Sequence, residues 1–255
     1  MDQQADAVVC LGDFFDKDTL TGEEITALTE LAWADLPHHF VVGNHEASSA
    51  DLSKSSQHVL ALGPDFIIHN TPTAVAMEGC QLCFLPYQPD DKVKRLNQYF
   101  PNPLPRVVFS HNNIKGLRMG RFVSDTGLEI NDIADNSLLF FNGHLHNRSC
   151  LSTRAWNVGN LTGQNFSEDA FKYDHIAAVV DTDARTVVPY CNPHALNFYQ
   201  VDWTNAADVQ SAITQIDRGN AVVSARVKER DRKTVQELLS AASNIIEYRI
   251  TVEPE

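Results

Sequence analysis

Four short polar clusters in the sequence contain residue types that bind divalent metal ions. The clusters are Gly12-Asp13-Phe14-Phe15-Asp16, Gly43-Asn44-His45-Glu46, Ser110-His111-Asn112 and Gly143-His144-Leu145-His146. Their carboxylate and amide oxygens, together with imidazole nitrogens, suit Mn²⁺, Fe²⁺ or Zn²⁺. Two such ions about 3.5–4 Å apart can clamp a phosphate and generate hydroxide for in-line attack. The clusters therefore indicate metal-assisted hydrolysis of a phosphate ester, provided that the fold brings them together.

Each cluster follows a short apolar run with the length and composition of a buried β-strand. These runs span residues 7–11, 40–42, 106–110 and 138–141. Open α/β sheets place their sites at the carboxyl ends of strands, so we expect the clusters to meet at one rim of a sheet. The glycines that precede Asp13, Asn44 and His144 allow tight turns that present the next side chain.

Other elements complete an α/β pattern. Thr21 followed by Glu24 resembles a capping box and predicts a helix that runs to about Trp33. Further short strands are predicted at 65–69, 74–77, 81–85, 198–203, 220–227 and 245–252, and further helices at 206–216 and 231–242. Alternating short strands and helices predict an α/β sandwich. The segment after residue 197 contains no His or Cys, so we expect it to shape or cap the site.

Composition limits the possible classes of protein. The chain has 255 residues, of which 43% are hydrophobic, which is enough for one sizeable core and a small second domain. No apolar run is long enough to span a membrane, and no signal peptide is recognisable. Five scattered cysteines fit a reducing compartment, and we expect a cytoplasmic protein.

The formal net charge of −13 argues against a free-standing, sequence-tolerant nucleic-acid binder, which normally carries a basic face. It does not exclude a nuclease. Bound cations invert the local field of a site, and a basic partner subunit can hold the substrate.

Taken singly, the clusters also have structural interpretations. Gly12-Asp13 alone fits a plain turn, and His111 alone fits a packed or capping histidine. Paired histidines at the end of a strand favour a metal, and the order of all four clusters makes chance a poor explanation. The histidines outside them are interpreted as surface or packing residues, and these are His38, His39, His58, His69, His175 and His194.

In this order, GDxxD, GNH(E/D), a lone histidine after an apolar strand and GHxH resemble the signatures of the calcineurin-like metallophosphoesterases. Within that superfamily, the chain is most similar to SbcD-type DNA repair nuclease subunits and to phage recombination endonuclease subunits. Supporting features are Leu85-Pro86-Tyr87 and the stretch 110–116. The resemblance implies two mixed sheets flanked by helices, with a catalytic domain at 1–197 and a small α/β capping domain at 198–255.

The resemblance also implies a set of metal ligands for two divalent ions, Mn²⁺ above all, with Fe²⁺ or Zn²⁺ as alternatives. Asp13 would bridge both ions. Asn44, His111 and His144 would complete the site of one ion, and His146 would bind the other.

Two further residues have implied roles. His45 would stabilise the phosphate or protonate the leaving oxygen, which suits a group that titrates near neutrality. Asp16 would orient the loop from outside the ligand set.

One motif of the superfamily is missing from the sequence. No Asp-x-His occurs in it, although this motif normally lies on the first strand and supplies ligands to one metal. We expect either an N-terminally shortened product or a natural one-metal variant that lacks the first strand. In both cases the strand before Asp13 would lose a neighbour and expose backbone groups. The site of Asn44, His111 and His144 is expected to remain, with weak binding of a second ion.

The function that this resemblance implies is hydrolysis of phosphodiester bonds in DNA during recombination or repair. The expected partners are DNA and an SbcC-type coiled-coil ATPase, and a homodimer is also expected. The alternatives are a phosphatase or nucleotide phosphodiesterase on the same scaffold, or a catalytically impaired binding subunit.

Overall fold

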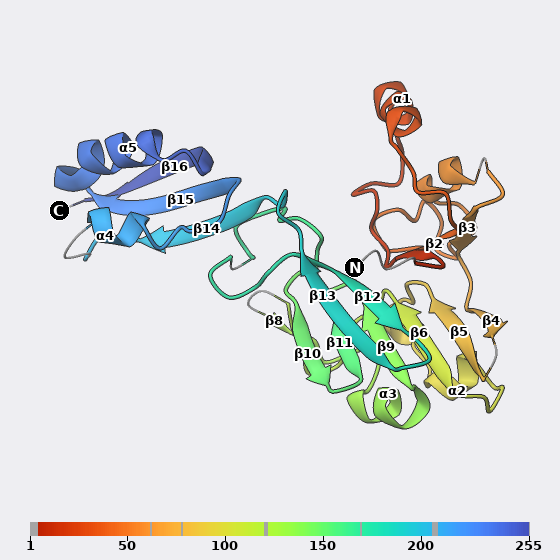
Figure 1. Ribbon diagram of the computed structural model, residues 1–255. Coiled ribbons are helices and arrows are strands. Elements are labelled where there is room, and N and C mark those ends of the chain that lie inside the picture. Colours follow the sequence, from red (N-terminus) through yellow and green to blue (C-terminus); the bar gives the residue numbers. More distant parts are fainter. Residues whose placement is uncertain are drawn as a thin grey trace. The chain divides into compact units, whose positions relative to one another are not determined.

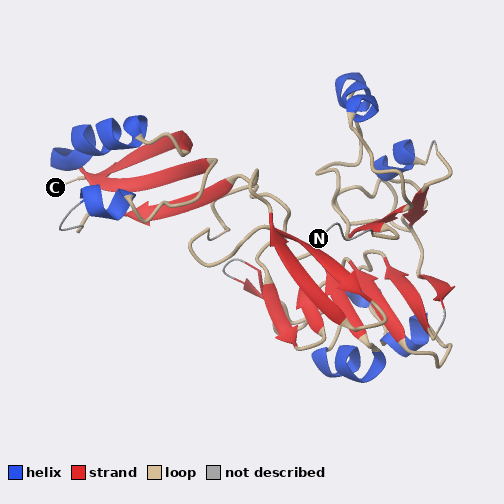
Figure 2. Cartoon of the chain, in the orientation of Figure 1, coloured by secondary structure: helices blue, strands red, loops and turns tan. Residues whose placement is uncertain are grey.

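The computed structural model describes residues 5–61, 63–77, 79–119, 122–168, 170–205 and 209–254 (Figure 1). It is a mixed α/β protein with several sheets and short helices (Figure 2). The chain divides into two compact units. Unit 1 contains Met1–Gly159 and Val179–Val187, and unit 2 contains Asn160–Ala178 and Val188–Glu255. The expected fold class is confirmed.

The first sheet of unit 1 has three parallel strands in the order β1-β2-β3. They are β1 (Val8–Cys10), β2 (His38–Val41) and β3 (Phe66–His69). β1 is therefore an edge strand, and no other strand in the described part of the chain pairs with its free side. The Asp13 cluster follows β1 and the Asn44 cluster follows β2, as the apolar runs predict.

The second sheet of unit 1 has six strands in the order β10-β11-β9-β6-β5-β4. Their bounds are β4 Thr73–Met77, β5 Cys80–Leu85, β6 Arg106–Ser110, β9 Leu139–Asn142, β10 Ser149–Ser152 and β11 Ala155–Asn157. The four central strands are parallel, and both edge strands are antiparallel to their neighbours. Consequently β6 and β9 end side by side, which places His111 and the 143–146 cluster at one rim.

Each face of this second sheet has its own apolar core, because side chains alternate along a strand. One face packs against Val41 of the first sheet and uses Phe84, Val107, Phe109, Leu139 and Phe141. The opposite face is covered by α2 (Leu96–Tyr99) and α3 (Ile130–Asn136), which contribute Leu96 and Ile133. The two sheets therefore pack face to face, with α2 and α3 on the outer face of the second sheet.

Two buried histidines join the sheets. His39 of β2 and His69 of β3 lie edge to edge, with His39 Nδ1 and His69 Nε2 2.9 Å apart. Both rings stack on Phe84 of the second sheet, at centroid distances of 4.7 and 3.8 Å. The interpretation of His39 and His69 as packing residues is confirmed.

Helix α1 (Gly22–Glu30) begins where the sequence predicts. Thr21 and Glu24 form the predicted capping box, with reciprocal hydrogen bonds. The helix ends at Glu30 instead of reaching Trp33. Trp33 packs instead against the rings of Phe14, Phe40 and Phe66, so aromatic packing ends the helix early.

Smaller elements complete unit 1. They are the 3₁₀ turns η1 (Ser56–Leu60) and η2 (Asp90–Lys92) and the short pair β7 (Arg118–Met119) and β8 (Phe122–Val123). The hairpin of β12 (Ile176–Asp181) and β13 (Thr186–Cys191) adds Val180 and Val187 to the core of unit 1.

Unit 2 contains a parallel sheet in the order β14-β15-β16. The elements are β14 Asn197–Asp202, α4 Val209–Ile213, β15 Ala221–Lys228, η3 Glu229–Asp231, α5 Arg232–Ala241 and β16 Ile245–Glu253. Val235 and Leu239 of α5 pack against Val223 and Val227 of the sheet. The predicted β-α-β-α-β order is confirmed, and residues 206–208 of the predicted first helix lie outside the described residues.

The predicted capping domain, residues 198–255, lies within unit 2, which also contains 160–178 and 188–197. Its role as a cap stays a prediction. None of the helices in the described residues is long and apolar enough to cross a membrane.

Candidate metal centre

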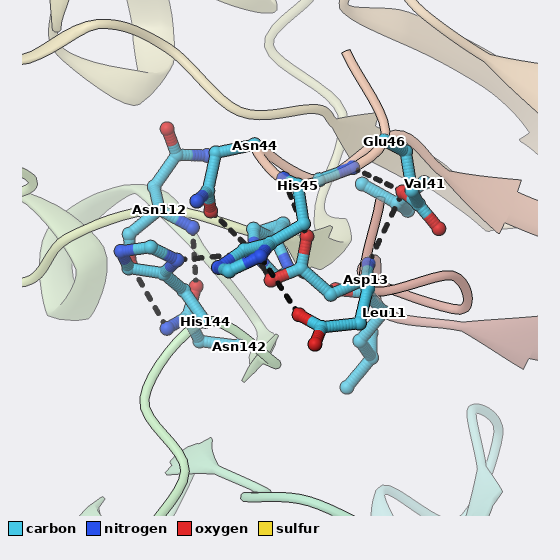
Figure 3. A network of polar contacts seen from close by, with 12 residues as sticks. Leu11, Asp13, Val41, Asn44, His45, Glu46, Asn112, Asn142 and His144 are labelled. Carbon is cyan, nitrogen blue, oxygen red and sulfur yellow. Dashed lines mark hydrogen bonds and ion pairs between the residues drawn. The ribbon is translucent and has the colours of Figure 1, made fainter. Parts of the chain in front are cut away.

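His111 Nε2 is the meeting point of donor atoms from four different loops. Asp13 Oδ2 lies 3.1 Å from it, Asn44 Oδ1 3.2 Å and His144 Nδ1 3.0 Å. Figure 3 shows Asp13, Asn44 and His144 directed toward the same point. Four residues separated by up to 131 positions (13 to 144) therefore share one small region of space.

A backbone hydrogen bond on the Nδ1 side fixes the orientation of the His111 ring. Its Nδ1 lies 2.7 Å from the carbonyl oxygen of Leu11, at the end of β1. A carbonyl oxygen can only accept a hydrogen bond, so Nδ1 carries the proton and donates it. In the neutral ring, Nε2 then presents its lone pair to the three facing atoms. A backbone carbonyl behind a histidine is a common arrangement for a metal ligand.

Two glycines allow the donor atoms to approach this closely. A Cβ on Gly12, which has a φ of +97°, would overlap the His111 ring. A Cβ on Gly43 would overlap the Asp13 carboxylate. Asp13 itself adopts a φ of +49°, a conformation that asparagine and aspartate tolerate better than most residues. The positive φ of Gly12 fits the expected tight turn, whereas at Gly43 the close approach of Asp13 leaves no room for a side chain.

Asp13 also contacts the loop that carries Asn44. The His45 backbone N–H donates to Asp13 Oδ1 at 3.1 Å. Burial alone raises the pKa of Asp13, but without a metal ion this effect is outweighed by a His111 ring protonated on both nitrogens, through its hydrogen bond and charge, and by the bond from His45. The pKa of Asp13 therefore falls below its ordinary value, and the carboxylate is ionised.

The His45 side chain is partly exposed, and it lies close enough to the donor group for its charge to act on Asp13 and His144. Its side chain is 45% exposed, and its Nδ1 lies 2.8 Å from Asp16 Oδ1. Asp16 therefore contacts the ring of His45, and this contact orients the imidazole. The roles that the sequence assigns to both residues stay predictions.

His144 and His146 differ in their positions. His144 belongs to the group with Asp13 and His111, whose ligand atoms all lie within 4.8 Å of one another, whereas His146 lies outside it. Burial, followed by the charges of His111 and His146, lowers the pKa of His144 to about 4, against an opposing effect of Asp13. His144 is therefore neutral at pH 7, which is the form that binds metals. The assignment of His146 to a second ion stays a prediction.

Glu46 connects the two loops of the first sheet. Its side chain is fully buried, and Oε2 accepts from the N–H groups of Gly43, at 2.8 Å, and Asp13, at 3.2 Å. Oε1 accepts from the N–H of Phe15 at 3.0 Å and from Gln57 Nε2 at 2.5 Å. Burial raises the pKa of Glu46, and the bonds from Gly43, Phe15 and Gln57 oppose this. All four acceptor sites of the carboxylate are used, so Glu46 fixes both loops.

Three fully buried asparagines connect the loops of the second sheet. Asn142 Oδ1 accepts from the Asn112 N–H at 2.9 Å, while its Nδ2 donates to the Asn112 carbonyl and to Asn157 Oδ1, both at 3.0 Å. Asn157 Nδ2 in turn donates to the carbonyls of Leu145 and Asn147. Amide side chains thereby hold the backbone of Asn112, which follows His111, and of Leu145, which follows His144.

Asn112 extends this network to a third loop. Its Nδ2 donates to the carbonyls of Leu85 and Pro86, and its Oδ1 accepts from the Gln88 N–H at 2.8 Å. The loop of Tyr87 is therefore fixed to the loop of His111. Tyr87 lies beside His144, with ring centroids 5.9 Å apart.

The donor atoms fit a divalent cation. Asp13 Oδ2, Asn44 Oδ1 and the lone pair of His111 Nε2 are all electron-rich, and they face one another at hydrogen-bond distance. Such an arrangement is unfavourable without positive charge between the atoms. Mixed carboxylate, amide and imidazole donors suit Mn²⁺, Fe²⁺ and Zn²⁺. Asp13, Asn44, His111 and His144 are thus the residues that would hold one ion.

The family model that matches this chain is that of the calcineurin-like phosphoesterases, and it covers residues 2–180. The chain belongs to this family. No curated protein sequence matches the chain at a significant level. The resemblance at superfamily level is confirmed, and the chemistry of the phosphoesterase is metal-dependent hydrolysis of phosphate esters.

Several supporting residues of this phosphoesterase had no predicted role. Glu46 and Asn112 belong to the clusters, but their buried hydrogen bonds depend on distant partners. Asn142 and Asn157 look like ordinary residues at strand ends. The only sequence signal for them is an asparagine as the last residue of two strands that prove to be neighbours, β9 and β11.

Proposed function

We propose that this phosphoesterase hydrolyses phosphodiester bonds of DNA, as the nuclease subunit of a recombination or repair complex. The observation that carries the proposal is the convergence of Asp13, Asn44, His111 and His144 on one point. The order of the four clusters and the additional α/β unit support the SbcD-type subfamily over a simple phosphatase.

We assign separate roles to the residues of the centre, namely metal binding and proton donation. Asp13, Asn44, His111 and His144 would hold the ion. When bound, a divalent ion neutralises charge on the phosphate and makes a water molecule more acidic. His45 Nδ1 contacts Asp16, and in its doubly protonated form His45 would deliver the Nε2 proton to the leaving oxygen and keep the Nδ1 proton against Asp16.

The acidic surface implies a partner. A net charge of −13 repels a DNA backbone, so this chain alone supplies little of the binding energy. We propose that a second subunit with a basic DNA-binding surface provides it, by family resemblance an SbcC-type coiled-coil ATPase. In this view the protein acts in the cytoplasm, and two copies can assemble as a dimer.

The test offers the Mn²⁺-loaded chain single-stranded DNA, double-stranded DNA, a phosphomonoester and a cyclic nucleotide in parallel. We expect cleavage of DNA at low ionic strength, with loss of cleavage in His45→Ala while metal stays bound. A chain that hydrolyses only the phosphomonoester or the cyclic nucleotide would replace the nuclease by a phosphatase or nucleotide phosphodiesterase. Loss of metal in His45→Ala would make His45 a ligand instead.

One observation favours a second candidate, a catalytically impaired binding subunit. In the described part of the chain, the donor atoms form one three-residue group of His and Asp, and His146 lies outside it. A centre that holds one ion binds phosphate but clamps it less firmly than two ions do. DNA binding that depends on Mn²⁺, without cleavage under any condition that activates a two-metal nuclease, would support this candidate.

A further inference from the structure

A small cavity lies directly beside the metal centre. It has a volume of about 220 Å³, and its lining includes Asn44, Leu52 and Tyr87. Asn44 also belongs to the donor group, so a ligand in the cavity is adjacent to any phosphate held there. The volume is below the ~300–1,000 Å³ typical of sites for drug-sized ligands, which suits a single ring system.

One wall of the cavity is the ring of Tyr87, which the fold holds in place. The Tyr87 N–H donates to the carbonyl of Val42 at 2.9 Å, and the neighbouring Gln88 N–H donates to Asn112. The ring is half-buried beside His144. A fixed aromatic ring next to a phosphate site offers a flat surface on which another ring can stack.

Another part of the lining is the loop that carries the buried Leu52. Leu52 is 5% exposed and has a φ of +58°, a conformation that is costly for leucine. The loop maintains this conformation with bonds of its own. Asp51 accepts from the side chains of Ser49 and Ser53, and the Ser48 N–H donates to the carbonyl of Lys54. Strain held by surrounding hydrogen bonds is typical of ligand sites.

The charge around the cavity selects against a second phosphate. Its lining contains no Lys, Arg or His, and Asn44, Ser48 and Ser49 are its polar residues. Two carboxylates outside the donor group, Asp90 and Asp91, lie near enough to Tyr87 for their charges to act on it. A negatively charged group is therefore repelled, whereas a neutral ring with hydrogen-bonding edges is accepted.

We propose that this cavity, between Tyr87 and Leu52, binds the base of a nucleotide whose phosphate lies at the metal centre. The inference rests on the proposed function, because it names the substrate class of the same centre. The base stacks on Tyr87, its apolar edge contacts Leu52, and Ser48 offers a hydroxyl group to its polar edge. Neutral bases of every type have a stacking face, so the site accepts nucleotides without strong sequence preference.

Two substrates with the same leaving group and charge test the inference. They are thymidine 5′-(4-nitrophenyl) phosphate and methyl 4-nitrophenyl phosphate, which differ only in the nucleoside. With the Mn²⁺-loaded chain we expect a KM for the nucleoside ester roughly tenfold below that of the methyl ester, as one stacked base contributes. Equal KM values would overturn the inference and leave phosphodiester hydrolysis intact.

Variants of the residues that line the cavity can be compared by the ratio of KM for the methyl ester to KM for the nucleoside ester. Tyr87→Ala should bring the ratio close to one, and Tyr87→Phe should preserve it, because stacking needs the ring and not the hydroxyl. Ala50→Trp, at an exposed position of the lining, should fill the cavity without a folding defect. Tyr190→Ala is the matched control, since Tyr190 is an exposed tyrosine of unit 2. An unchanged ratio in both Tyr87→Ala and Ala50→Trp would reject the site.

A binding measurement separates this inference from the proposed function. Saturation-transfer NMR with deoxyadenosine reports occupation of the cavity without any turnover, and deoxyribose is the control ligand. We expect transfer to the base protons that is lost in Ala50→Trp. Transfer without hydrolysis of either ester would support the base site while contradicting the nuclease. Hydrolysis of both esters without saturation transfer would reject the base site and leave phosphodiester hydrolysis supported.

Discussion

His111 and His144 face each other with Nε2 and Nδ1 3.0 Å apart, although 33 residues separate them in the chain. The two rings meet because β6 and β9 are parallel neighbours that end at the same rim. His111 donates through Nδ1 to Leu11, so its Nε2 lone pair would be available to a cation, which His144 Nδ1 would also contact. One shared ion accounts for this geometry better than two unrelated packing contacts.

The first prediction concerns metal content. Removal of His111 or His144 by substitution with alanine should weaken Mn²⁺ binding by about 100-fold or more, the upper limit seen when only supporting residues of a site are lost. Isothermal titration of the metal-free chain measures the affinity, and elemental analysis gives the stoichiometry. We expect one tightly bound ion per chain.

Two variants serve as references for this measurement. His194→Ala changes an exposed histidine of unit 2 and should bind metal like the wild type. His146→Ala should retain the tight ion, since His146 lies outside the donor group. Two tightly bound ions in the wild-type chain would contradict the expected one-ion centre.

The second prediction concerns Glu46. Each carboxylate oxygen of Glu46 accepts two hydrogen bonds. Glu46→Gln replaces one of these oxygens by an NH₂ group. Two hydrogen bonds are then lost, and the new NH₂ donor faces two N–H donors. We expect a loss of about 2–4 kcal/mol in the free energy of unfolding, since each buried unpaired group costs ~1–3 kcal/mol. Urea denaturation of the metal-free chain measures it.

The Glu46 variant should also bind Mn²⁺ more weakly, because its carboxylate joins the Asp13 and Asn44 loops. Glu30→Gln, at an exposed position of α1, is the matched control and should change neither quantity. If Glu46→Gln unfolds at a lower urea concentration but binds Mn²⁺ with wild-type affinity, then Glu46 supports the fold without positioning the ligands.

Much of the fold follows from local sequence. The strands β1, β2, β6 and β9 each contain a short apolar run, although β1 is only partly buried, and the capping box marks the start of α1. The small edge strand β10 was not predicted, because Ser149–Ser152 contains only two apolar residues and no alternation that stands out. Trp33 shows the other limit, since its packing against Phe14 and Phe66 is a tertiary contact that overrides helix continuation.

The positions of the four donor residues could be predicted from the sequence because each follows a recognisable strand. Asp13, Asn44, His111 and His144 each follow a recognisable strand, so their convergence could be expected. The buried hydrogen bonds of Glu46 and Asn142 could not be predicted, because they depend on which backbone and side-chain amides the fold places opposite these side chains. The same reason applies to Tyr87 and Leu52, which become neighbours of one cavity only through the folded loops.

The third prediction concerns the asparagine network. Asn142→Ala removes three hydrogen bonds of a fully buried side chain and leaves the Asn112 N–H and Asn157 Oδ1 without their partner. We expect the free energy of unfolding to fall by about 2–4 kcal/mol. Asn97→Ala, at an exposed position of α2, should have little effect. A loss below 0.5 kcal/mol, about that of an ordinary surface substitution, would show that other groups satisfy these partners.

The fourth prediction concerns acid stability. Burial, and then the charge of His39, lowers the pKa of His69 to about 4 from an ordinary value of 6.5. Between these two values the unfolded chain binds a proton at His69 that the folded chain does not bind. Stability is therefore complete above about pH 6.5 and falls as the pH decreases toward 4. The contribution of His69 over this window is roughly 3 kcal/mol.

Urea denaturation at a series of pH values, with EDTA present to remove metal effects, measures this contribution. His69→Leu keeps an apolar side chain against Phe84 and should give a flatter decline between pH 6.5 and 4 than the wild type. His194→Leu changes an exposed histidine and should leave the wild-type slope unchanged. Because the comparison uses slopes, the constant loss caused by the missing His39 partner does not affect it. Parallel curves for wild type and His69→Leu would show that the fold tolerates a charged His69 between the two sheets.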